Sequence, residues 1–96
     1  AAGGQGCISV VSNIAPALCS QLHTAWAAGD TATALALHQK LMPLHEELFI
    51  EASPGPVKYA ASLLGLCGPT TRLPLCKISD SSKAAVKDAL VAAELL

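Results

Sequence analysis

The run His45-Glu46-Glu47 is the first candidate for chemistry, because it begins like the zinc-binding pattern H-E-x-x-H. That pattern needs a second histidine one helical turn later, and Phe49 stands at that position. His38 precedes His45 on the same predicted helix, but two helical turns separate the imidazoles by about 10 Å, too far to share an ion. We therefore expect no metal site.

The serines and lysines of the chain are the candidate nucleophiles, and none has the sequence context of an activated one. Ser9 and Ser12 lack the G-x-S-x-G turn of an activated serine, and no His-Asp pair has a recognisable context. A lysine that forms a Schiff base needs a desolvated amine with a lowered pKa. Lys58, beside Tyr59, follows a proline-rich turn, where a solvated lysine is ordinary. We expect no catalytic group in this chain.

Glycines and cysteines also point away from a bound cofactor or metal. Gly3, Gly4 and Gly6 precede a predicted strand, whereas a dinucleotide-binding fingerprint follows one, so we expect no cofactor. The four cysteines contain no C-x-x-C pair. We expect them to be buried, reduced thiols of a cytoplasmic protein, and two disulfides of a secreted chain are the alternative.

Composition indicates a chain that needs other protein to cover it. Of its 96 residues, 52% are hydrophobic and 14% charged, more apolar surface than so small a domain buries. A net charge of -1 gives no field for nucleic acid or anionic lipid. The longest apolar stretch, residues 57–67, is too short to span a bilayer. No secretory signal or initiator Met is visible, and we treat Ala1 as a cut end.

The first half of the chain predicts one strand and two helices. Residues 7–11 are rich in β-branched side chains and favour a buried strand, which would need neighbours that this sequence does not supply. Pro16 and Gly29 bound a helix at about 15–28. Asp30 is a natural N-cap for the next helix, where Pro43 predicts a kink or break near Leu41 rather than one straight rod.

Two shorter helices follow. Pro56 can open one that ends before Gly68, and residues 73–78 predict an extended connection. The last helix begins at Ser79 or Asp80 and carries a buried stripe made mostly of small side chains. The stripe consists of Val86, Ala89, Leu90 and Ala93.

Several motifs in a fixed order resemble one enzyme family. They are Gly4-Gln5-Gly6-Cys7-Ile8-Ser9-Val10, Asn13-Ile14-Ala15-Pro16, Leu41-Met42-Pro43-Leu44-His45, Leu48-Phe49-Ile50-Glu51, Pro54-Gly55-Pro56-Val57-Lys58 and Arg72-Leu73-Pro74-Leu75. The chain resembles the last third of the 4-hydroxy-tetrahydrodipicolinate synthase family, also called dihydrodipicolinate synthase. That resemblance implies a parent α/β protein, a (β/α)₈ TIM barrel with a C-terminal helical domain. Residues 1–29 would be the last βα unit, and residues 30–96 the helical domain.

The resemblance also implies an activity. The family condenses pyruvate with L-aspartate 4-semialdehyde in diaminopimelate and lysine biosynthesis, through a Schiff base on a lysine that belongs to an earlier strand. Only Ile8 matches a pocket position, where its backbone oxygen would border pyruvate. The implied partners are the remainder of the barrel and the other subunits of a cytoplasmic homotetramer.

Two other functions stay open at this point. The chain could belong to another pyruvate lyase of the same superfamily, which shares the barrel. It could also be a non-catalytic helical interaction module that binds a partner through its surplus apolar surface.

Overall fold

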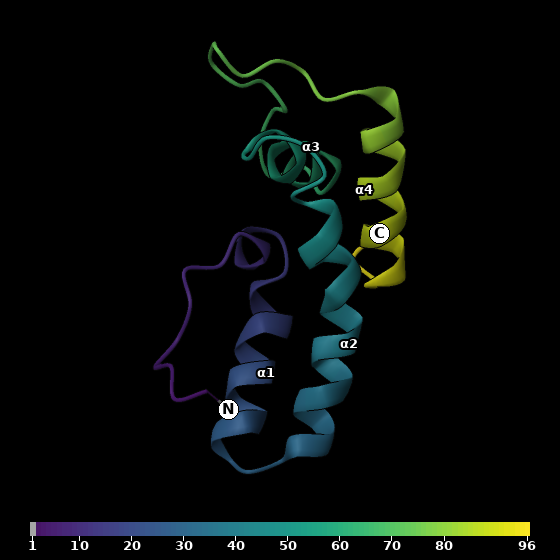
Figure 1. The fold of residues 1–96 in the computed structure, drawn as a ribbon. Helices are drawn as coiled ribbons and strands as arrows, with labels where there is room; N and C mark the ends of the chain where they lie inside the picture. Colours follow the sequence, from purple (N-terminus) through teal and green to yellow (C-terminus); the bar gives the residue numbers. More distant parts are fainter. Residues whose placement is uncertain (1) are drawn as a thin grey trace.

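The computed structural model describes residues 2–96, and Ala1, the expected cut end, lies outside them. Four α-helices occur in this part, after one short 3-10 helix, η1 (Val11–Asn13). They are α1 (Pro16–Ala27), α2 (Thr31–Glu47), α3 (Gly55–Leu63) and α4 (Asp80–Ala92) (Figure 1). None of them is both long and apolar enough to cross a membrane.

The expected strand at residues 7–11 is not formed. Across residues 2–96 no strand occurs, and Val11 begins η1 instead. The preceding residues run without regular structure beside α1 (Figure 1). A strand is held by hydrogen bonds to a neighbouring strand, and none is present to supply them. The mostly helical character of the chain is confirmed, whereas the strand prediction is wrong for these residues on their own.

The ends of α1 follow from local signals in the sequence. Pro16 occupies the first helical position, where its missing N–H costs nothing. Gly29 takes a φ of 78° just beyond the helix, and its N–H donates to the Trp26 carbonyl. The next N–H, of Asp30, donates to the Ala25 carbonyl, which completes a Schellman cap. The predicted helix 15–28 is therefore confirmed to within one residue at each end.

α2 begins where predicted, and of the kink or break expected near Leu41, the break does not occur. The Asp30 carboxylate accepts from the Thr33 N–H at 3.0 Å, as an N-cap does. The helix then runs through Pro43 to Glu47. Leu41 and Leu44 are buried on the two sides of Pro43. Packing of both turns in one core outweighs the hydrogen bond that proline removes.

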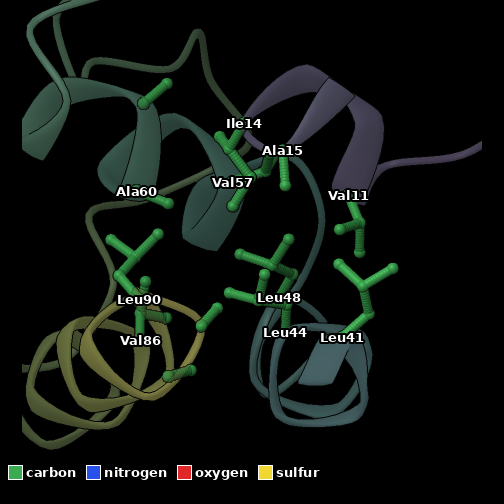
Figure 2. Packing of buried hydrophobic residues seen from close by; sticks show 13 residues of the cluster. Val11, Ile14, Ala15, Leu41, Leu44, Leu48, Val57, Ala60, Val86 and Leu90 are labelled. Carbon is green, nitrogen blue, oxygen red and sulfur yellow. The ribbon is translucent and has the colours of Figure 1, made fainter. Parts of the chain in front are cut away.

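A single apolar cluster joins η1 to α2, α3 and α4 (Figure 2). The stripe predicted on α4 is confirmed, because its four residues are all at least 96% buried. Small side chains let the elements approach closely. A Cβ on Gly55 would lie 2.8 Å from Ile78 Cγ2. The largest contributors are Val11, Ile14, Leu41, Leu44, Leu48, Val57, Val86 and Leu90.

Polar contacts fasten both ends of α4. Glu51, in the turn after α2, accepts from the Ser79 N–H at 2.9 Å and from the Ser79 hydroxyl at 2.8 Å. Ser79 is the N-cap of α4, and its hydroxyl also accepts from the Ser82 N–H. At the other end Lys40 of α2 forms an ion pair with Glu94. Both contacts join segments far apart in the sequence.

Candidate functional site

Ile8, the one predicted pocket residue, lies in the segment that precedes η1. Its side chain is fully exposed. Within the described chain, no backbone hydrogen bond involves residues 2–8. The Ile8 carbonyl is therefore left free to accept from a group outside this chain.

Two serines fix the backbone immediately after Ile8. The Ser12 N–H donates to Ser9 Oγ at 3.1 Å, and the Ser12 hydroxyl donates to the Ser9 carbonyl at 2.8 Å. Asn13 Nδ2 donates to the Val10 carbonyl at 3.0 Å. These short-range bonds orient the chain where it leaves the extended segment. Sequence reasoning considered the serines only as nucleophiles, and their three-residue spacing is the signal of this local role.

An open groove of about 810 Å³ separates this segment from α1 and α2. Its α1 side presents Leu22, His23 and Trp26, and its α2 side includes Leu35. Cys7 Sγ lies 3.8 Å from His23 Nε2 across the groove. Trp26 and Leu35 remain about half exposed, at 48% and 56%. The groove is thus an uncovered, mainly apolar surface.

The thiols are free, as expected, but the prediction that they are buried is wrong for three of them. Cys7, Cys67 and Cys76 are exposed, because they lie in irregular segments outside the helical core. Cys19, on α1, is partly buried. Burial raises the pKa of the Cys19 thiol, which the Ser9 hydrogen bond only partly opposes.

Two lysines, Lys40 and Lys83, form ion pairs with carboxylates. Lys83 Nζ lies 2.7 Å from Asp80 Oδ1, and this hydrogen bond raises the pKa of Lys83. A Schiff-base amine needs the opposite shift. Lys58 is half-buried at the start of α3, and Lys40 is bound to Glu94. The ion pairs of Lys40 and Lys83 are therefore typical of a structural role and not of a Schiff-base amine.

The histidine pair of α2 is not part of a larger ligand set. His38 and His45 are both exposed. Over residues 2–96 no group of three or more His, Cys, Asp or Glu side chains is placed to hold a metal ion.

The sequence profile of the Dihydrodipicolinate synthetase family matches residues 1–93. The chain belongs to this family. A 4-hydroxy-tetrahydrodipicolinate synthase from Bradyrhizobium diazoefficiens is 58% identical over 94 residues, which are 98% of this chain and 32% of that relative. The chain therefore spans about a third of the length of such relatives.

Solved dihydrodipicolinate synthases share the fold. The enzyme of Thermotoga maritima matches 98% of this chain and 32% of its own, with a TM-score of 0.93 and 38% identity. The chloride-inhibited enzyme of Acinetobacter baumannii, complexed with pyruvate, matches the same shares with a TM-score of 0.90 and 36% identity. These relatives are TIM-barrel enzymes, so the chain has the fold of a mostly helical portion of such a barrel.

Proposed function

We propose that the chain is the carboxyl-terminal third of a 4-hydroxy-tetrahydrodipicolinate synthase. The whole enzyme would be a lyase that condenses pyruvate with L-aspartate 4-semialdehyde for diaminopimelate and lysine biosynthesis. The observation that carries this proposal is 58% identity to a synthase over 98% of the chain. In this proposal residues 1–29 complete the barrel, and residues 30–96 form the appended helical domain.

The Schiff-base lysine would lie outside this chain. The contacts of Lys40 and Lys83 support this view, because each amine lies in an ion pair with a carboxylate and not in a desolvated pocket. This chain's contribution would be structural, together with one backbone acceptor near the substrate. The complete enzyme would work in the cytoplasm as a homo-oligomer, by resemblance a tetramer.

A covalent chimera tests the activity. It joins the part of the Bradyrhizobium diazoefficiens relative that this chain does not match to residues 1–96. We expect the chimera to consume pyruvate only with aspartate semialdehyde, and borohydride to trap pyruvate on the relative's portion. The 96-residue chain alone should trap none. A trapped lysine within residues 1–96 would contradict the assignment, and turnover of sialic-acid-type substrates instead would favour another pyruvate lyase.

Ile8 would border pyruvate through its carbonyl oxygen. Support comes from its unbonded backbone and from the serine contacts that fix the next residues. Replacing the Ile8–Ser9 amide of the chimera by an ester weakens that acceptor, and we expect KM for pyruvate to rise roughly 2- to 10-fold. An ester between Ala2 and Gly3 is the control. Equal effects of the two esters would remove Ile8 from the pocket.

A further inference from the structure

α1 is the least covered helix of the chain. None of its residues is fully buried, although Leu18, Leu22 and Trp26 follow one another at helical spacing. It packs against α2 on one side. The groove of about 810 Å³ lies along the helix, with the extended segment on its far side. A helix with an uncovered apolar face indicates a surface that other protein covers.

The extended segment adds a second unpaired surface. Residues 4–8 keep their backbone N–H and C=O groups free of hydrogen bonds to the described chain. Such a row of donors and acceptors is a template for an added β-strand. Ile8 is exposed on the same segment. The extended segment runs beside α1 (Figure 1), so its free backbone groups lie next to the apolar residues that line the groove.

The core does not depend on the extended segment, whereas Leu18, Cys19 and Leu22 of α1 pack against the core. Every residue of the buried cluster lies between Val11 and Ala93, and none comes from residues 2–8 (Figure 2). The polar contacts of Glu51 and Lys40 likewise join elements beyond η1. The helical unit thus has its own core, while the extended segment and one face of α1 remain uncovered.

The backbone that carries the open surfaces aligns with that of a solved synthase. The match to the Thermotoga maritima synthase covers 98% of this chain, which leaves room for only about two unmatched residues. Most of residues 4–8 are therefore aligned together with α1. A surface that has its bound shape beforehand loses little entropy on binding.

We propose that residues 11–96 fold autonomously and that the segment Gly4–Ile8 with the groove over α1 is a preformed docking surface. Its occupant is the barrel portion of the synthase, which can bind as a separate polypeptide and thereby complete the barrel without a covalent link. This inference rests on the proposed function, because it takes the occupant to be the family's barrel.

A cleavable version of the chimera tests the docking. A protease site is placed directly before Ala1, and the purified chimera is cut. We expect the 9.7 kDa chain to stay bound to the barrel portion on size exclusion, with activity retained. In the Gly6→Pro variant, which loses one ladder N–H, cutting should release the chain. Gly6→Ala is the matched control, because a Cβ there meets nothing within 4 Å.

Hydrogen exchange supplies an independent reading that needs no variant. In the isolated chain, we expect the amides of residues 41, 42, 44–48 and 86–90 to be protected and those of residues 4–8 to exchange freely. In the chimera, amides at 4–8 should exchange roughly 100-fold more slowly. Unprotected helices in the isolated chain would refute autonomous folding.

The outcomes separate the two proposals. An active chimera that loses both its activity and the chain on cutting would refute docking and leave the proposed function standing. An inactive chimera would refute the proposed function, and retention or release of the cut chain would still decide the docking.

Discussion

Leu44 lies in the middle of the apolar cluster and has no exposed surface. We predict that Leu44→Ala lowers the free energy of unfolding of the chain by about 2–5 kcal/mol, because it leaves a cavity among packed neighbours. Urea denaturation followed by circular dichroism measures the loss. Leu35→Ala on the same helix is the control, because Leu35 is 56% exposed. A similar loss for both variants would contradict the position of the core.

Glu51 should make the chain sensitive to acid. Hydrogen bonds from the Ser82 hydroxyl and from the N–H and hydroxyl of Ser79 hold the pKa of the Glu51 carboxyl below its ordinary 4.5. A lowered pKa stabilises the fold above the ordinary value, and that contribution is lost as pH falls through the folded pKa. Thermal unfolding from pH 6 downward should therefore show a decrease below about pH 4.5.

The variant Glu51→Gln checks that assignment. We expect its unfolding temperature to be lower than that of the wild type at pH 6 and to fall less steeply in acid. Glu46→Gln, an exposed carboxylate on α2, controls for the general loss of charge. Parallel pH profiles for wild type and Glu51→Gln would contradict the contact with Ser79. Glu94 and Asp80, whose pKa values are lowered by Lys40 and Lys83, retain their own share of the acid response in both proteins.

At the scale of elements, α4 depends on its N-cap. Ser79→Ala removes the hydroxyl that accepts from the Ser82 N–H and donates to Glu51. We predict a loss of about 1 kcal/mol in the free energy of unfolding. Ser20→Ala, in the exposed interior of α1, should instead be neutral or slightly stabilising because alanine favours helix. Chemical denaturation compares them, and equal losses would exclude a capping role.

The helix ends were predictable from sequence because their signals are local. Pro16, Gly29 and Asp30 each act within one turn of the backbone, so their residue types are sufficient. Whether α2 would continue through Pro43 or break there could not be decided from sequence, because the outcome depends on Leu41 and Leu44 meeting side chains of distant elements.

The missing strand and the exposed cysteines have a related cause. The side chains of residues 7–11 have the pattern of a strand, but a strand forms only when a neighbouring strand accepts and donates its backbone hydrogen bonds. Cys7 is apolar enough for a core, yet its segment finds no neighbour to bury it. Of the candidate site, the residue type and place of Ile8 came from resemblance alone. The groove beside it could not be foreseen, because helices from two parts of the chain form it.

At the scale of the whole molecule, the folded chain is more elongated than a compact domain of the same number of residues. Its radius of gyration is 14.2 Å and its extents are 43 × 24 × 20 Å, whereas about 12.5 Å is expected for a compact chain of this length. The apolar cluster occupies the end where η1 and the last turns of α2 meet α3 and α4, while α1 and the first turns of α2 project from it (Figure 1). On this arm the side chains of Trp26 and Leu35 remain about half exposed.

Removing residues 1–8 should leave this architecture intact. We predict that the shortened chain keeps its helical circular dichroism and unfolds within about 0.5 kcal/mol of the full chain, because the removed residues contribute nothing to the cluster. A loss of several kcal/mol on urea denaturation would show that the segment supports the core. Removal of residues 89–96 is the contrasting truncation, since it deletes Ala89, Leu90 and Ala93 from the cluster, and should unfold the chain.

Trp26 lies on the wall of the groove, and it is the only tryptophan of the chain. Its indole is half in water and half against its own helix pair. The ultraviolet fluorescence of the protein therefore originates almost wholly from this arm. Covering the groove should shift the emission to shorter wavelength, whereas unfolding exposes the indole fully to water and should shift it to longer wavelength. One spectrum therefore distinguishes assembly from unfolding without any added dye.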